Sequence, residues 1–140
     1  MNSKLAEFLA AEAARDWDAR THNCGLWLAD WLVIALGIAD PAAQLRADCA
    51  RNGMNAFTRF APLRETVAIC ARLGLPRTDD PLTGDIAVVA VRMPGARHIT
   101  GAIMGRRGWI VPAMPSRGLS RPAPQTVRCL AAWRIDECHT

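Results

Sequence analysis

Residues 22–36 read HNCGLWLADWLVIAL, a strongly apolar run of helical length with a cysteine near its start. The partial positive charge and the unpaired N–H groups at a helix N-terminus stabilise a sulfur anion, which lowers a thiol pKa of about 8.5 toward neutrality. Cys24 is therefore a candidate nucleophile. The alternative is an inert thiol packed under Trp27 or Trp31, because free cysteine is among the most buried residue types.

A second segment, residues 84–111, carries the signals of β-strands. It reads GDIAVVAVRMPGARHITGAIMGRRGWIV and places His98 in a predicted strand. A cysteine followed later in the chain by a histidine on a sheet is the order found in papain-like hydrolases, so His98 is a candidate general base. The alternative is a strand histidine that only satisfies a backbone partner.

The hydrophobic pattern predicts helices in the first half of the chain and an antiparallel sheet in the second. Helices are expected over residues 3–17, 24–36, 41–51 and 63–73, and strands over residues 85–92, 97–104, 109–113 and 127–135. Prolines and aspartates at 75–83 mark the change from helix to strand. The sequence thus predicts one α+β domain over 1–140, with a helical part at about 1–74 packed on a sheet at about 84–135.

Composition indicates a globular chain with a modest positive charge. Hydrophobic residues make up 51% and charged residues 21% of the sequence, which excludes a disordered chain. The net charge of +4 comes almost wholly from arginine, since Lys4 is the only lysine. The arginines are scattered without the basic run of a nucleic-acid-binding arm, so no nucleic-acid partner is expected. Arg106, Arg107, Arg117 and Arg121 cluster late in the chain and are interpreted as solvated charges.

The five cysteines indicate neither a disulfide framework nor a metal site. They occupy positions 24, 49, 70, 129 and 138, an odd number with no C-x-x-C pair. The histidines at 22, 98 and 139 do not combine with them into a compact ligand pattern, although Cys138 and His139 are adjacent. We expect no metal and no cofactor.

The N-terminal residues and the apolar run give expectations about targeting. Glu7, Glu12 and the lack of a long apolar core argue against a signal peptide, which predicts synthesis in the cytoplasm. The apolar run at 25–39 is too short for a bilayer of about 30 Å and is interrupted by Asp30, so no membrane span is expected.

Taken together, these segments resemble the NlpC-type papain-like cysteine peptidases, in the small variant encoded in phage tail modules and gene-transfer particles. NCGLWLADW at 23–31 resembles the nucleophile helix of that family, and GDIAVV at 84–89 resembles the Gly-Asp strand that opens its sheet. Gly118-Leu119 and AWRI at 132–135 are similar to a small family found beside tail-tip genes.

The resemblance implies a papain-like fold and a cell-wall endopeptidase of the phage tail tip. Cys24 would attack a carbonyl of a peptidoglycan stem peptide, His98 would act as base and then acid, and the Cys24 amide would help hold the oxyanion. The protein would be made in the host bacterial cytoplasm, join hub and distal tail proteins in the virion, and act at the periplasm or cell wall. The alternatives are an inactive structural component of the tail tip with the same fold and, less favoured, a bacterial amidase or toxin-like effector.

The spacing around the histidine departs from the family pattern. In the family the catalytic histidine lies two residues before a glycine, whereas His98 lies three residues before Gly101. Because side chains alternate along a strand, this shift turns His98 away from Cys24 unless a β-bulge restores its direction. The next predicted strand offers no polar residue to orient the imidazole. His22 is an alternative base, and Asp30 is expected to be a buried structural acceptor.

Overall fold

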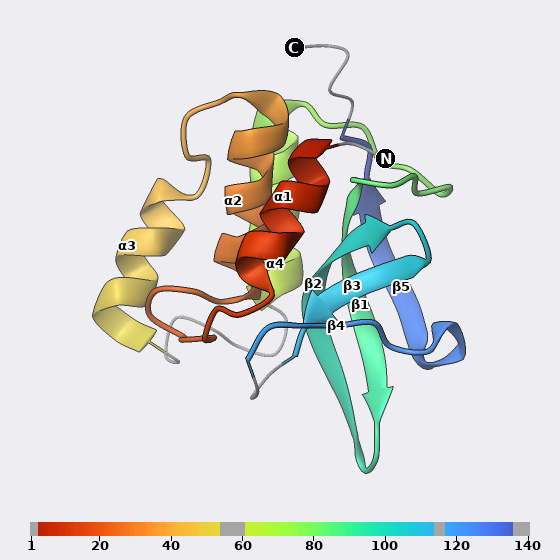
Figure 1. The fold of residues 1–140 in the computed structure, drawn as a ribbon. Helices are drawn as coiled ribbons and strands as arrows, with labels where there is room; N and C mark the ends of the chain where they lie inside the picture. Colours follow the sequence, from red (N-terminus) through yellow and green to blue (C-terminus); the bar gives the residue numbers. More distant parts are fainter. Residues whose placement is uncertain (1–2, 54–60, 114–116, 136–140) are drawn as a thin grey trace.

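The computed structural model describes residues 3–53, 61–113 and 117–135 (Figure 1). Within these ranges the helices are α1 (Ser3–Glu12), α2 (Cys24–Leu36), α3 (Ala43–Asn52) and α4 (Ala61–Leu73). The strands are β1 (Ile86–Met93), β2 (Ala96–Gly105), β3 (Gly108–Pro112), β4 (Leu119–Ser120) and β5 (Val127–Trp133), with the 3-10 turn η2 (Pro124–Thr126) before β5. The predicted α+β class, with helices first and an antiparallel sheet second, is confirmed.

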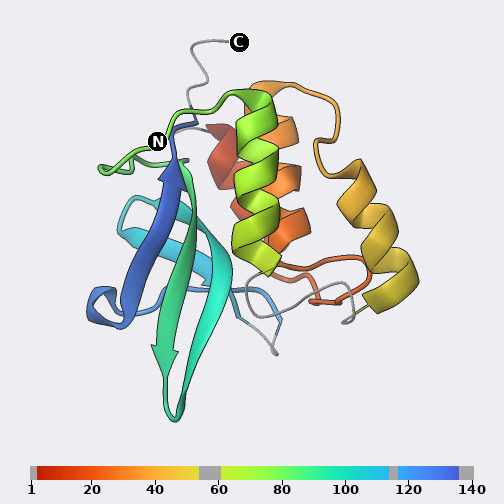
Figure 2. The same cartoon turned by 180° about the vertical axis from the view of Figure 1, so that it is seen from behind.

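The strands form one antiparallel sheet in the order β4-β3-β2-β1-β5. The helices lie on one side of it, and α3 is the helix farthest from the sheet (Figure 2). β1 and β2 pair without a register shift from Ile86 opposite Ile103 to Met93 opposite Ala96, whereas the irregularity in β1 lies on its β5 side, between Val88 and Val89. The alternation of side chains along β2 is therefore regular.

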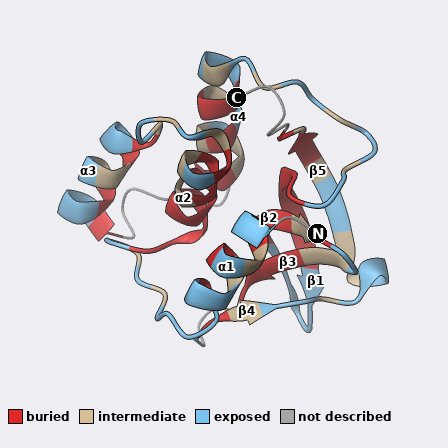
Figure 3. Cartoon of the chain, turned by 45° about the horizontal axis from the view of Figure 1, so that its top comes forward, coloured by how far each residue is buried: buried red, intermediate tan, exposed pale blue. Residues whose placement is uncertain are grey.

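The main core lies between α2 and the sheet. Trp27 and Trp31 of α2 are fully buried, and α2 is the most buried of the helices (Figure 3). The ends of α2 match its prediction because both caps are local: Asn23 accepts hydrogen bonds from the first-turn N–H groups, and Gly37 ends the helix in the left-handed conformation at φ 63°.

α2 and β2 come closest at Gly101. A Cβ at this position would lie 2.7 Å from Leu28 Cδ1 and 3.0 Å from the Cys24 carbonyl oxygen. Both distances are shorter than the ordinary van der Waals separation of carbon from these atoms, so the close approach of strand and helix requires a glycine here. This contact places the start of α2 against β2.

The first helix is shorter than predicted. α1 ends at Glu12, whereas the sequence pattern predicts a helix to Trp17. At the helix end Glu12 is buried against His22, and Asp18 and His22 form a backbone bridge that closes the loop. The Trp17 indole donates a hydrogen bond to the Gly118 carbonyl, 2.6 Å away, which ties the loop to the far end of the sheet. These partners are distant in sequence, so a local pattern does not reveal them.

Strand β4 was not predicted. It has two residues and pairs with Val111 and Pro112 of β3, which gives too short a pattern to recognise. Gly118 precedes it with φ 81°, and a Cβ there would collide with the Ala13 carbonyl oxygen. In the described part of the chain, no helix is both long and apolar enough to cross a membrane.

Candidate functional site

Cys24 occupies the first position of α2, as the sequence predicts, and is only 8% exposed. Cys24 lies beside Gly101 of β2. At Gly101, β2 is paired with β1 but not with β3, since the β2–β3 pairing covers only Ile103 to Gly105. The backbone of Gly101, the side chain of Thr100 and the first amides of α2 all act on the thiol by hydrogen bonding. The thiol therefore sits at the predicted helix start, with polar groups from β2 around it.

The pKa of Cys24 is raised, and the expectation that it is lowered is wrong. Burial is the largest cause, because it disfavours the charged thiolate, and it outweighs the hydrogen bonds from Gly101, Thr100 and the helix amides. A helix N-terminus activates a thiol only where the desolvation of the anion costs less than the helix amides contribute. Burial of the sulfur thus opposes formation of the thiolate that a nucleophile needs.

His98 lies on the face of β2 opposite to the helices. It pairs with Val91, whose side chain belongs to a small apolar cluster on that face, whereas Ile99 pairs with Ala90 in the main core. No bulge interrupts the β1–β2 pairing, so the one-residue shift relative to the family pattern is not compensated. His98 and Thr100 share one face of β2 by alternation, and it is Thr100, not His98, whose side chain hydrogen-bonds to the Cys24 thiol. The helix-facing position two residues before Gly101 is occupied by Ile99.

The surroundings of His98 differ in kind from those of Cys24. His98 is exposed and lines a pocket of about 360 Å³ with Thr100, Val111 and Ser120. Thr100 is shared between this pocket and the hydrogen bonding of the thiol, but His98 lies two residues farther along the strand, about 7 Å away. The hydrogen bonds that act on the thiol come from Gly101, Thr100 and the first amides of α2, whereas His98 is exposed to solvent.

His22, the alternative base, is engaged elsewhere. Its Nε2 lies 2.8 Å from Glu12 Oε2, and its ring stacks on Trp17 with 4.4 Å between centroids. The side chains of Glu12 and His22 are almost fully buried, and Arg15 contacts the other Glu12 oxygen at 3.1 Å. Burial lowers the pKa of His22, while the negative charge of Glu12 opposes the shift. His22 therefore anchors the loop before α2 to α1.

Sequence reasoning missed the pairing of Glu12 with His22, although one signal was present. Glu12 falls seven residues after Leu5, on the same helical stripe as Phe8 and Leu9. A carboxylate on a buried apolar stripe needs a partner, because burial of an unpaired charge is costly. That partner is His22, ten residues later.

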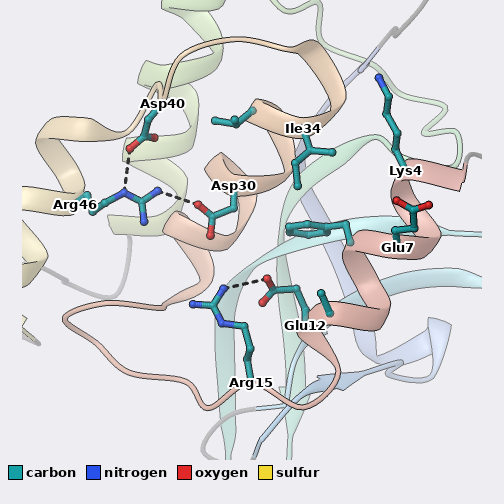
Figure 4. A pocket seen from close by; sticks show the side chains of 11 residues that line it. Lys4, Glu7, Glu12, Arg15, Asp30, Ile34, Asp40 and Arg46 are labelled. Carbon is teal, nitrogen blue, oxygen red and sulfur yellow. Dashed lines mark hydrogen bonds and ion pairs between the residues drawn. The ribbon is translucent and has the colours of Figure 1, made fainter.

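A groove of about 600 Å³ runs between α1 and α2 (Figure 4). Arg46 spans Asp30 and Asp40, with 2.9 Å contacts to each, and on the opposite side of the groove Arg15 contacts Glu12 (Figure 4). Asp30 thus acts as an acceptor for Arg46, but its side chain is partly exposed (27%) rather than buried as expected. Because these charges pair with one another, the groove offers little net charge to a ligand.

The Gly-Asp motif before β1, Gly84-Asp85, links several segments of the fold by hydrogen bonds. The Asp85 carboxylate is 1% exposed and accepts hydrogen bonds of 2.8 Å from Arg134 Nε and from the backbone N–H groups of Leu82 and Ile135. The Gly84 carbonyl accepts a 2.8 Å hydrogen bond from the Trp31 indole. The motif therefore joins α2, the start of the sheet and the chain after β5.

The described cysteines are free thiols, and the pKa of Cys70 is strongly shifted. Burial raises the pKa of Cys70 to about 12, against about 8.5 in an unfolded chain. The folded state holds this proton more tightly, so the stability it contributes is complete below about pH 8.5 and is lost as the pH rises toward 12. Tyrosine and lysine add little in this window, because the sequence has no tyrosine and one lysine, but burial also raises the pKa values of Cys24, Cys49 and Cys129.

We expect the free energy of unfolding to fall with pH between 9 and 11, by on the order of 1 kcal/mol per pH unit for Cys70. Urea denaturation at several pH values measures this slope, and Cys70→Ala should reduce it. The matched control is Cys129→Ala, since Cys129 is exposed and contributes less. An unchanged slope in Cys70→Ala would contradict the assignment.

Among the described residues, no group of three or more His, Cys, Asp or Glu side chains is arranged to hold a metal ion. Cys138 and His139 lie outside the described residues. A family model described as a domain of unknown function (DUF6950) matches residues 1–135. No curated protein and no solved structure matches the chain.

Proposed function

Since the chain belongs to the DUF6950 family, whose model covers residues 1–135, we propose a function on the geometry of the chain itself: a non-catalytic, NlpC-type papain-like domain that serves as a structural component of a phage tail tip or gene-transfer particle. Its partners would be the neighbouring hub and distal tail proteins. The endopeptidase alternative would need an activated thiol and a base beside it.

The observation that carries the non-catalytic assignment is the identity of the residue that faces the helices on β2. The family pattern puts the catalytic histidine two residues before a glycine, and here that position is Ile99, on the main-core side of the sheet. An aliphatic side chain neither accepts a proton nor stabilises a thiolate. His98 lies on the other face, and burial raises the pKa of Cys24.

The tail-tip part of the proposal is supported by the segments that resemble the small tail-module family. In this chain those segments have roles in folding: Asp85 ties the sheet to Arg134, and Gly118 packs against the loop after α1. Retention of the framework segments without the base fits a domain kept for its shape. Such a domain contributes a rigid surface to an assembly.

The first test is the reactivity of Cys24. We expect iodoacetamide at pH 7 to alkylate Cys24 in the folded protein more slowly than in the urea-unfolded chain, because burial raises the pKa of Cys24 and shields its sulfur from the reagent. His98→Ala should leave this rate unchanged. Mass spectrometry of the peptide that contains Cys24 measures the rate separately from the exposed Cys129.

The second arm tests activity and location in the particle. Purified protein should release no fragments from peptidoglycan, and particles made with Cys24→Ser should assemble and infect like the wild type. An antibody to the protein should label the tail tip. Release of stem-peptide fragments that is lost in Cys24→Ser would overturn the non-catalytic assignment, and particles that lack the protein would overturn the structural role.

A further inference from the structure

A second pocket lies between α1 and the turn that joins β2 to β3. It has a volume of about 800 Å³ and is distinct from the surroundings of Cys24 and from the groove between α1 and α2. Two kinds of side chain form it: three arginines, and an apolar set from α1 and the sheet. Its lining residues are Ala6, Leu9, Gly105, Arg106, Arg107, Ile110 and Arg121.

The charge of this pocket is uncompensated. Arg106 and Arg107 form the two-residue turn between the paired Gly105 and Gly108, and Arg121 comes from the segment after β4. The pocket lining includes no carboxylate, and among the residues that the structure describes, none of the three arginines forms an ion pair. By contrast, Arg15 and Arg46 in the α1–α2 groove are paired.

Three exposed arginines in one pocket repel one another and concentrate a positive potential there. An anionic ligand would relieve this repulsion. Guanidinium groups favour carboxylates and phosphates, because their planar N–H donors match two oxygens at once. Charge alone therefore predicts an anion but does not choose between these two classes.

The apolar lining makes that choice. Ala6 and Leu9 are half-buried on α1, and Ile110 of β3 is buried beside them. Interfaces between proteins combine an apolar centre with a polar rim, as this pocket does. A phosphate or polyphosphate would leave the apolar part unused, whereas a peptide with apolar and acidic side chains would cover both parts.

From this combination we propose that the pocket between α1 and the β2–β3 turn docks an acidic segment of a partner protein, with an apolar side chain against Ala6 and Leu9 and carboxylates on Arg106, Arg107 and Arg121. The inference rests on the residues of the pocket and stands whichever assembly contains the domain. It also gives a role to arginines that the sequence pattern interpreted as solvated charges.

The test uses the full chain and a fluorescein-labelled peptide of alternating leucine and glutamate, followed by fluorescence anisotropy. We expect the double variant Arg106→Ala/Arg121→Ala to weaken binding at least about tenfold, since two charge-assisted contacts are lost. The matched control is Arg92→Ala/Arg97→Ala on the exposed β1–β2 hairpin, which removes the same charge and should bind like the wild type.

Ala6→Glu tests the pocket without removal of any arginine. A carboxylate on α1 should pair with the arginines within the chain and abolish peptide binding, while thermal unfolding stays cooperative. The proposal is overturned if the native protein does not bind the peptide at millimolar concentration, if the two double variants weaken binding equally, or if polyglutamate without leucine or pentaphosphate binds as tightly as the leucine-glutamate peptide.

Discussion

Replacement of Asp85 by alanine is expected to lower the free energy of unfolding by about 3 kcal/mol or more. The carboxylate is buried and is the acceptor for Arg134 Nε and for the Ile135 backbone N–H, both at 2.8 Å. Without it, the Ile135 N–H is left buried with no acceptor, and the charge of Arg134 loses its partner. Arg134 is one-third exposed, so water compensates part of the loss on its side.

Urea denaturation at pH 7 measures this effect, with two variants for comparison. Asp85→Asn keeps an acceptor oxygen and the side-chain volume but removes the charge, so its loss should be smaller than that of alanine. Asp79→Ala changes an exposed aspartate in the loop before β1 and should alter stability by less than about 0.5 kcal/mol. If Asp85→Ala is as stable as Asp79→Ala, the hydrogen bonds of Asp85 do not stabilise the fold.

Helix α2 and the positions of four strands along the chain were predictable because their signals are local. An asparagine before Cys24 and a glycine after Leu36 fix both ends of the helix, and alternating apolar residues identify the strands. The end of α1 was not predictable in this way. Glu12 contacts His22 at the helix end, and Trp17 binds Gly118 about a hundred residues away, so the segment after α1 is held by contacts that a local pattern does not show.

At the candidate site, the position of Cys24 was predictable, but its chemical environment was not. The spacing of α2 places Cys24 at a helix start, but the desolvation that raises its pKa comes from the packing of β2 on that helix. The direction of His98 was accessible from the period of two along a strand. What the sequence could not show is that β2 lacks the bulge that would turn the histidine back, because bulges depend on the pairing of both strands.

The second large effect is expected at Trp31. Trp31→Ala should lower the free energy of unfolding by about 3 to 5 kcal/mol, because it removes a fully buried indole and leaves a cavity in the main core. The ring packs against Phe8 of α1, with 5.5 Å between centroids, and its Nε1 donates to the Gly84 carbonyl at 2.8 Å. One side chain thus links α1, α2 and the start of β1.

Trp31→Phe separates packing from hydrogen bonding. It keeps most of the ring but leaves the Gly84 carbonyl without its donor, so we expect a loss of about 1 to 3 kcal/mol by urea denaturation. Trp109→Ala, a half-buried tryptophan on the other face of the sheet, serves as the control and should cost less than Trp31→Ala. Equal losses for Trp31→Ala and Trp109→Ala would contradict the central role of Trp31. Under the proposed structural role, incorporation into particles should fall with the stability of the Trp31 variants and remain unchanged in Cys24→Ser. An enzyme would instead lose its activity in Cys24→Ser.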